Sequence, residues 1–376
     1  MNSELNCCKL PLNNGVTERV KFMNDAAHYL DEQKKSTLKK LKEKKENPRV
    51  YEIEKNDLLI ISRCPVCLSK DLRLLTEVYI NGQLNFFSTV TCVSCLFTFR
   101  SVSPGLKWFK KCWQIIETAV PEVFNPEVEL DRIARYEKYY EAISRYRKTG
   151  HLLDVGAAFG TGTNLFREKG FRVEAVEPEI NKTNYLRKKW GIKVVADSIE
   201  TFVRQKRRYD VIIFSACLEH IDNPVTVIKR IKNLLNPNSG LLYLEVPTIW
   251  NYVSWSDALY LTHKSNFSKE HLTYLAELGG LEIVEDFFYK PCHVGLLLKP
   301  RQNNQNKPKL IRPPKNITDI ARLYRKDLPL KKHLPPLNAV IKYSVSHIEQ
   351  FFQTLNLSDK KMIAPNHWSG FITFSV

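Results

Sequence analysis

Four cysteines form two closely spaced pairs in the first third of the chain. Cys64 and Cys67 enclose Pro-Val, Cys92 and Cys95 enclose Val-Ser, and 24 residues separate the two pairs. Two thiolate pairs, each on a tight turn, provide the four soft ligands of a tetrahedral zinc ion. The separation is slightly longer than usual, and a β-hairpin would fill it. We expect a structural zinc site that holds together a segment too small to fold alone.

A glycine-rich turn lies in the stretch LLDVGAAFGTGTNLF, residues 152–166. An apolar run and an acid, Asp154, precede Gly156, Gly160 and Gly162, and an apolar face at helical spacing follows. A triphosphate-binding loop would end in Gly-Lys-Ser or Gly-Lys-Thr, a dinucleotide fingerprint would read G-x-G-x-x-G, and this turn has neither pattern. Because a carboxylate here would repel a pyrophosphate at the helix N-terminus, the turn favours a ligand with an ammonium group and no phosphate.

Five further segments follow this turn along the chain. They read AVEPE, VVADSIE, YDVIIFSACLEHIDNP, LLNPNSGLLYLEVPT and HKSNFSKEHLTYLAELGGLEIVE. With these segments, residues 151–300 resemble a class I S-adenosylmethionine-dependent methyltransferase, and S-adenosylmethionine is a ligand of the kind that the turn favours. The resemblance implies a cofactor site formed by Asp154, Gly156, Ala158, Gly160, Glu177, Pro178, Asp197, Ser198, Ser215, Cys217 and Leu218.

The resemblance implies roles for four of these residues that also make physical sense. Gly156 and Gly160 have no Cβ, so the backbone can approach the methionine part of the cofactor. Asp154 lies at a strand end, where the family places an acid near the amino end of the ligand. Glu177, one helix later, is positioned to accept both ribose hydroxyls, as an acid does in dinucleotide folds.

The remaining cofactor residues are expected around the adenine and the sulfonium. Asp197 and Ser198 end the third strand near the adenine, and residues 215–218 form the floor beneath the sulfonium. The family often has glycine where this chain has Ala158. We expect the turn to accommodate the methyl group, at a cost of roughly 1 kcal/mol in cofactor affinity if Ala158 needs a positive φ.

Two histidines follow predicted strands and are candidate catalytic residues. His220 lies in LEHIDNP after the fourth strand, and His263 lies in LTHKSNFS after the fifth. Open α/β sheets place chemistry at the carboxyl ends of strands, and methyl transfer to a hydroxyl needs alignment and a base. Either histidine could be that base, with His220 preferred, or the Glu219–His220 pair could simply hold its loop. Some relatives bind a metal through acids here, but Ala216 replaces one such acid, so we predict no catalytic metal.

The methyl acceptor is expected from a second resemblance. The sequence TCVSCLFTFRSVSP is similar to the ribbon that precedes the methyltransferase domain in a group acting on nucleotide sugars or surface glycans. This implies transfer to a hydroxyl, or an activated carbon, of a sugar or related small metabolite. Two alternatives stay open. One is an RNA methyltransferase that binds through its basic segments and ribbon, and the other is a non-catalytic partner protein that only binds cofactor or glycan.

The elements that position these residues alternate along the chain. Seven runs are strand-like, with helix-like stretches between most of them: HLLDV, FRVEAVE, KVVAD, YDVIIFS, GLLYLEV, LEIVEDF and VGLLLK. The first helix should end at Gly170, and later helices should begin at Asp222-Asn223-Pro224 and at Ser268. We predict an α/β fold with a doubly wound, mostly parallel, seven-stranded Rossmann-like sheet, preceded by a small zinc ribbon.

The chain is expected to divide into five segments. They are a charged extension (1–50), the zinc ribbon (51–107), a helical connector (108–149), the methyltransferase domain (150–300) and a basic proline-rich arm with a C-terminal helix and strand (301–376). The expected C-terminal helix covers about 339–355, and the expected strand is FITFSV.

Positive charge is concentrated in two segments. The net charge is +17, and residues 34–49 and 299–332 carry net charges of +6 and +9. Such segments can bind phosphates or an anionic membrane face, so contact with nucleic acid or peripheral contact with a membrane stays open. A solvated helix and a solvated linker explain them at least as well.

The predicted location is the cytoplasm. No apolar run approaches the ~20 residues that cross a bilayer, and the N-terminus lacks the pattern of a secretory signal. The chain has nine cysteines, an odd number that fits a reducing compartment better than a disulfide framework. Cysteines without ligand spacing are expected to be inert; they are Cys7, Cys8, Cys112, Cys217 and Cys292.

Overall fold

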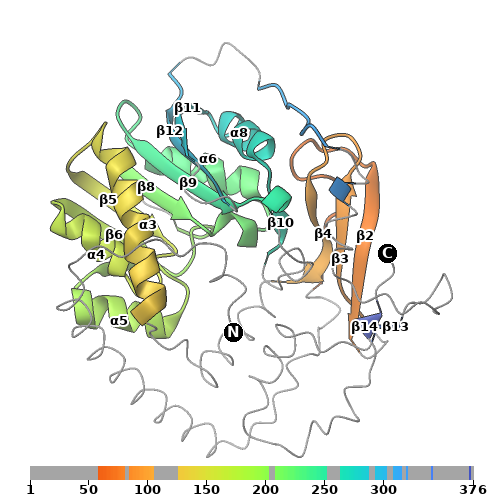
Figure 1. Cartoon of the computed structure of the whole chain (residues 1–376), viewed down its shortest axis with the longest axis horizontal. Helices are drawn as coiled ribbons and strands as arrows, with labels where there is room; N and C mark the ends of the chain where they lie inside the picture. The colour runs from red at the N-terminus through yellow and green to blue at the C-terminus, as the bar shows by residue number, and fades with distance from the viewer. Residues whose placement is uncertain are drawn as a thin grey trace, which may run out of the picture.

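Two β-sheets form the framework of the computed structural model (Figure 1). The structure describes residues 58–80, 84–105, 126–202, 208–251, 263–287, 293–302, 308–315, 319–320, 340–341 and 372–373. The predicted extension at 1–50, with its basic segment, lies outside the described residues, as do Cys7, Cys8, Cys112 and Cys292.

The larger sheet contains all seven predicted strands. They are β5 (Gly150–Val155), β6 (Phe171–Val176), β7 (Lys193–Ala196), β8 (Val211–Ser215), β9 (Leu241–Pro247), β11 (Leu281–Phe287) and β12 (His293–Pro300). Their order in the sheet is β11-β12-β9-β8-β5-β6-β7. The strands from β9 to β7 pair in parallel, whereas β12 is antiparallel to both of its neighbours. The sheet is therefore mixed, with one reversed strand in the predicted parallel arrangement.

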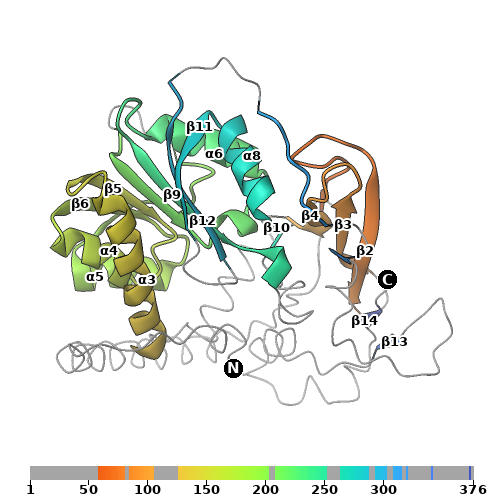
Figure 2. The ribbon, with the colours of Figure 1, turned by 45° about the horizontal axis from the view of Figure 1, so that its top comes forward.

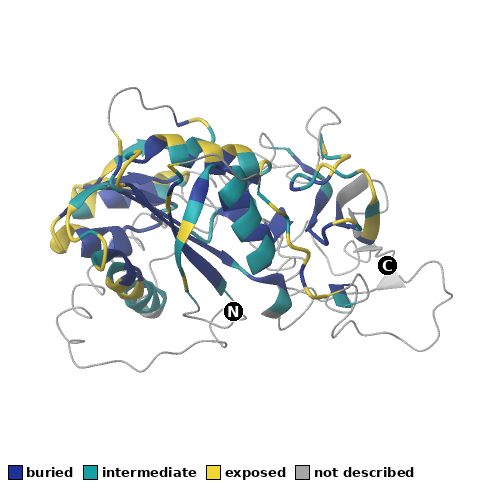
Figure 3. Cartoon of the chain, turned by 90° about the horizontal axis from the view of Figure 1, so that it is seen from above, coloured by how far each residue is buried: buried dark blue, intermediate teal, exposed yellow. Residues whose placement is uncertain are grey.

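Helices cover both faces of this sheet, as Figure 3 shows from above. On one face lie α3 (Pro126–Ser144), α4 (Thr161–Glu168) and α5 (Ile180–Trp190), and on the other lie α6 (Pro224–Leu234) and α8 (Lys269–Leu278). Successive residues of a strand point to opposite faces. Leu152 accordingly packs with the α3 layer and Leu153 with the α6 layer. Asp154 follows in the same alternation and faces α3.

Local signals position the helices as predicted. The Asn223 side chain accepts a hydrogen bond from the Thr226 amide at 3.1 Å, and Pro224 begins α6. Gly170 follows α4 with a φ of 96°, the left-handed conformation that favours glycine after a helix. Gly280, with a φ of 80°, follows α8 in the same way.

The second sheet is the expected cysteine ribbon. It consists of β1 (Leu58–Ile60), β2 (Leu72–Ile80), β3 (Leu84–Cys92) and β4 (Thr98–Pro104), in the order β1-β4-β3-β2. The β2–β3 hairpin spans the gap between the cysteine pairs. A short strand from between β9 and α8, β10 (Ser265–Asn266), pairs antiparallel with β4. The ribbon is thus joined to the α/β region by strand pairing (Figure 2).

The C-terminal region departs from the prediction at two residues. Val340–Ile341 form strand β13, which pairs antiparallel with β14 (Ile372–Thr373), so the helix expected over 339–355 is wrong there. Both are β-branched residues, which suit a strand. The rest of that range lies outside the described residues, whereas β14 falls within the predicted final strand. Among the helices of the described residues, none is long and apolar enough to cross a membrane.

Candidate active site

The glycine-rich turn between β5 and α4 has a left-handed backbone at three positions. Gly156, Ala158 and Gly160 have φ values of 80°, 51° and 78°. Glycine adopts this conformation freely, while alanine does so at a cost of roughly 1 kcal/mol. The turn accommodates Ala158 as expected, because its side chain is buried and its amide donates a hydrogen bond of 2.8 Å to Glu177 Oε2.

Two of the glycines are required because other side chains lie against them. A Cβ on Gly156 would lie 2.2 Å from the Cys217 sulfur, and a Cβ on Gly162 would lie 2.4 Å from the Tyr136 ring. Cys217 comes from the segment after β8, and its sulfur contacts the Val155 carbonyl at 3.4 Å. The turn is therefore packed tightly against the segment predicted to form the floor of the cofactor site, and burial raises the pKa of Cys217 well above its usual value.

Asp154 at the end of β5 is fully buried and held by two hydroxyl groups. Tyr136 Oη donates to the carboxylate at 3.0 Å, and Thr163 Oγ1 donates at 2.5 Å. Burial raises the pKa of Asp154 to about 6, although both hydrogen bonds and the nearby Arg132 lower it. Burial and the Asp154 charge also raise the pKa of Tyr136, so its hydroxyl remains a donor. Such a carboxylate exchanges its proton near neutral pH.

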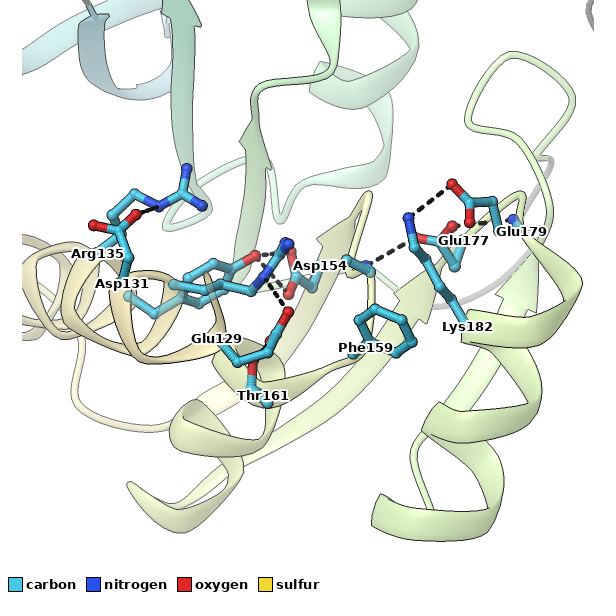
Figure 4. Close-up of polar contacts among 12 residues, drawn as sticks. Glu129, Asp131, Arg135, Asp154, Phe159, Thr161, Glu177, Glu179 and Lys182 are labelled. Carbon is cyan, nitrogen blue, oxygen red and sulfur yellow. Dashed lines mark hydrogen bonds and ion pairs between the residues drawn. The ribbon is translucent and has the colours of Figure 1, made fainter. Parts of the chain in front are cut away.

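Glu177 at the end of β6 is the second buried acid of the site. Its Oε2 accepts from the Ala158 amide, and its Oε1 accepts from the Glu179 amide at 3.0 Å. Burial raises the pKa of Glu177, whereas the positive charge of Lys182 lowers it. Figure 4 shows the Lys182 ammonium group pointing toward the Glu179 carboxylate near Glu177, and its Nζ lies 2.7 Å from Glu179 Oε1. These contacts fix the carboxylate orientation and leave each oxygen able to accept a further hydrogen bond.

Helix α3 supplies contacts to the site that the sequence interpretation missed. Tyr136 lies on this helix. Two turns earlier, Glu129 accepts a hydrogen bond from Thr161 at the start of α4 (Figure 4) and another from Arg132. The Arg132 guanidinium lies close enough to lower the pKa values of both Asp154 and Glu177. We therefore add Arg132 to the groups that could contact a charged ligand.

A third buried acid lies beside this site on the same face of the sheet. Glu245 on β9 accepts from Tyr139 Oη at 3.0 Å, from Ser215 Oγ at 3.3 Å and from Tyr243 Oη at 2.9 Å. Tyr139 lies one helical turn after Tyr136 on α3 and is 2.9 Å from Ser215 Oγ. Burial raises the pKa of Glu245. The predicted Ser215 thus lies in a network that ties α3 to the ends of β8 and β9.

The two predicted histidines meet around one carboxylate. The short helix η2 (Leu218–His220) follows β8, and Glu219 Oε1 lies 3.9 Å from Nε2 of both His220 and His263. The two rings contact edge to face, with centroids 5.0 Å apart. The side chain of His220 is 37% exposed and that of His263 only 10%. Solvent and a ligand can therefore reach His220 more readily.

The His263 imidazole of this cluster is held in its neutral form. Burial lowers the pKa of His263 well below its usual value, and His220, Arg100 and His293 lower it further. Glu219, His220 and His263 offer three ligand atoms within 4.8 Å of one another, the size of a metal site. Burial is the main reason that the His263 imidazole is neutral beside Glu219.

A family model described as a methyltransferase domain matches residues 129–286. The chain contains a class I S-adenosylmethionine-dependent methyltransferase domain. The matched residues begin within α3, so Arg132, Tyr136 and Tyr139 lie inside the methyltransferase domain together with the glycine-rich turn and His220.

Several solved structures are similar to this methyltransferase domain. One is the PH0226 protein from Pyrococcus horikoshii OT3, with 16% identity over 45% of this chain and 90% of that chain and a TM-score of 0.39. Another is the CcbJ methyltransferase from Streptomyces caelestis, with 13% identity over 44% and 89% of the two chains and a TM-score of 0.38. At these identities nothing about the substrate follows. No curated protein matches the chain in sequence.

The remaining predicted cofactor residues have fewer contacts with the glycine-rich turn than Asp154 and Glu177 have. Pro178 is exposed between the two glutamates, and Asp197 is exposed just after β7. Ser198 is half-buried, and its hydroxyl contacts Glu200 Oε2 at 2.6 Å. The Leu218 side chain is fully buried in the hydrophobic core, so only its backbone could face a ligand.

Outside the methyltransferase domain, the four predicted metal ligands lie together. The sulfurs of Cys64 and Cys95 are 3.6 Å apart, those of Cys67 and Cys92 are 3.4 Å apart, and all four lie within 4.8 Å of one another. Tetrahedral zinc with bonds of about 2.3 Å separates its sulfurs by about 3.8 Å. The residues therefore fit a zinc ion. We name them the four-cysteine cluster.

The backbone around these cysteines repeats the same turn twice. Leu68 donates to the Cys64 carbonyl at 2.9 Å, and Leu96 donates to the Cys92 carbonyl at 2.8 Å. Both leucines have left-handed φ values, 63° and 65°. Without a cation, the neighbouring Cys92 sulfur and burial raise the pKa of Cys64 to about 12. Four thiolates can persist together only around a cation, so the cluster is suited to a metal and poorly suited to being empty.

Proposed function

We propose that the chain transfers a methyl group from S-adenosylmethionine to a hydroxyl, or an activated carbon, of a sugar or related small metabolite. The observation that carries the proposal is the position of two sets of residues at the carboxyl ends of neighbouring strands. The turn after β5, with Asp154, suits the cofactor, and the segment after β8, with Glu219 and His220, suits the acceptor. Ligands bind at this edge of open α/β sheets.

The cofactor residues have proposed roles that follow from their charge. S-adenosylmethionine supplies a methyl group on a sulfonium, which is already a good leaving group. Asp154 would contact the ammonium group, Glu177 the two ribose hydroxyls, and Arg132 the carboxylate, since each group then meets opposite charge or a hydrogen-bond partner. Gly156, where a Cβ would collide with the Cys217 sulfur, would keep the turn in place for the cofactor.

His220 is the proposed general base. The cofactor would supply the methyl group to the acceptor oxygen, and Nε2 of His220 would accept the proton that the acceptor hydroxyl loses. Glu219 stabilises the imidazolium formed, and His263 stays neutral beside it because of its burial. The four-cysteine cluster is proposed to hold zinc as a structural ion. The cytoplasmic location and the five segment boundaries remain predictions.

The test is methyl transfer to fractionated acceptors. The full chain loaded with zinc is incubated with methyl-labelled S-adenosylmethionine and with nucleotide-sugar, lipid-linked sugar or RNA fractions. Label in a sugar fraction supports the proposal, and loss of that label in His220→Ala supports the base. A matched control is His151→Ala, since His151 lies at the opposite end of β5 and contacts Glu174. Label in RNA alone, or in no fraction despite cofactor binding, would refute the proposed acceptor.

A further inference from the structure

The ribbon is packed onto the methyltransferase domain through a continuous buried interface. Ser265 and Asn266 of β10 pair with Phe99 and Thr98 of β4, and the Arg100 amide donates to the Lys264 carbonyl at 2.9 Å. Beside them, the rings of Phe97 and Phe267, both fully buried, have centroids 5.3 Å apart. The cysteines of the ribbon and residues of α8 belong to one hydrophobic core. If the metal served only to stabilise the ribbon itself, the ribbon would not need this interface with the methyltransferase domain.

A buried histidine links α8 directly to the four-cysteine cluster. His271 Nε2 lies 2.9 Å from the Cys95 carbonyl oxygen, and Nδ1 lies 2.9 Å from Ser268 Oγ. Because a carbonyl only accepts, Nε2 carries the proton, and Nδ1 accepts from the Ser268 hydroxyl. The ring also contacts the edge of Phe97, with centroids 5.1 Å apart. Burial lowers the pKa of His271 to about 4, which agrees with this neutral form.

The same stretch of chain reaches the proposed catalytic group at its other end. It begins with His263, whose Nε2 lies 3.9 Å from Glu219 Oε1. The next residue, Lys264, donates its amide to the Glu219 carbonyl at 2.7 Å, and its Nζ forms an ion pair with Asp222. Residues 263–271 therefore contact η2 at one end and the turn of Cys95 at the other.

We propose that His271 is a positioning residue that couples metal binding at the four-cysteine cluster to the placement of His263 beside Glu219 and His220. A metal ion fixes the turn that carries the Cys95 carbonyl, and His271 holds α8 and β10 against that turn. When the metal is removed, the turn relaxes and the hydrogen bond between His271 and the Cys95 carbonyl is lost, so the ribbon holds residues 263–271 less firmly. The inference rests on the metal binding proposed above. The glycine-rich turn is not one of the elements that form this link, so metal removal should leave it unchanged.

The experiment compares hydrogen–deuterium exchange in the zinc-loaded and chelated full chain. Removing zinc should speed exchange at least tenfold in peptides covering 263–272, while peptides covering 152–166 change less than twofold. His271→Phe keeps a ring against Phe97 but lacks the N–H donor. This variant should keep one zinc per chain and still exchange like the chelated wild type over 263–272, and its Kd for S-adenosylmethionine should stay within twofold.

The control variant is His151→Phe, which alters a histidine outside this segment. It should leave exchange over 263–272 unchanged. His271→Gln, which restores an N–H donor, should return the exchange toward wild type. The proposal is overturned if chelation leaves 263–272 unchanged, if zinc-loaded His271→Phe exchanges like wild type, or if the chain binds no zinc. None of these readouts needs methyl transfer, so they stand apart from a failure of the proposed function.

Discussion

The affinity for S-adenosylmethionine should fall as the pH is lowered through about 6, because the proposed contact of Asp154 with the ammonium group of the cofactor needs the ionised carboxylate. Its pKa is raised from 3.8 to about 6 by burial. In the ligand-free protein the same shift has the opposite effect. There the folded chain retains a proton on Asp154 that the unfolded chain has released. The free energy of unfolding therefore falls as the pH rises from 3.8 to about 6.

The size of the effect follows from that pKa. With a value of about 6, the carboxylate is about 90% ionised at pH 7 and about 10% ionised at pH 5, so the Kd should rise about tenfold between them. The cofactor amine stays protonated over this range. Thr163 donates a hydrogen bond of 2.5 Å to Asp154 and lowers its pKa. Thr163→Val removes that bond at nearly constant volume and should move the midpoint upward by roughly one pH unit.

The assay is isothermal titration of the full chain with S-adenosylmethionine at pH values from 5 to 7.5. Thr163 has no contact with the Glu177 carboxylate, so an upward shift of the midpoint in Thr163→Val would assign the titration to Asp154. A Kd that does not change with pH in the wild type would refute the reasoning. So would the same midpoint in both proteins.

Four other outcomes follow from the structure. Ala158→Gly should raise the free energy of unfolding by about 0.5–1 kcal/mol in urea titrations, because glycine removes the strain of a left-handed φ; a decrease would contradict this. Arg132→Gln should weaken S-adenosylmethionine binding about tenfold in calorimetry, since a charge-assisted contact is lost. His220→Ala should lower kcat by about 10²–10⁴ with an unchanged cofactor Kd, and His263→Ala should lower it less; near-normal turnover in both would disprove the base. Chelation should release one zinc per chain, measured with a metal-sensitive dye, and Cys92→Ser should retain less zinc than wild type.

Much of the fold could be predicted because its signals are local. Each of the seven strands of the large sheet is a short apolar run. The helix ends at Asn223 and Gly170 are indicated by the capping residues themselves and by their neighbours in sequence. The reversal of β12 carries no such signal, because an apolar strand reads the same in either direction. The error at Val340–Ile341 has another cause: their partner strand lies about thirty residues further along the chain, so no neighbouring residue indicates the pairing.

The candidate site was less accessible to sequence reasoning. The spacing of the four cysteines indicates a metal site and Asp154 stands directly before the glycines, whereas Glu177 is implied by the family resemblance. Tyr136 and Tyr139 lie in the segment expected to be a helical connector (108–149), and their three-residue spacing places both on one face of a helix. What that face meets depends on packing against Asp154 and Glu245, whose side chains come from other parts of the chain.

The central claim is that the acid-bearing turn after β5 binds a cationic methyl donor that has no phosphate. The most direct measurement is calorimetric titration of the zinc-loaded chain with S-adenosylmethionine, NAD and ATP in parallel. The account predicts one saturable site for S-adenosylmethionine, lost in Gly156→Val, and no heat of binding with the other two. Binding of NAD or ATP without any binding of S-adenosylmethionine would contradict it.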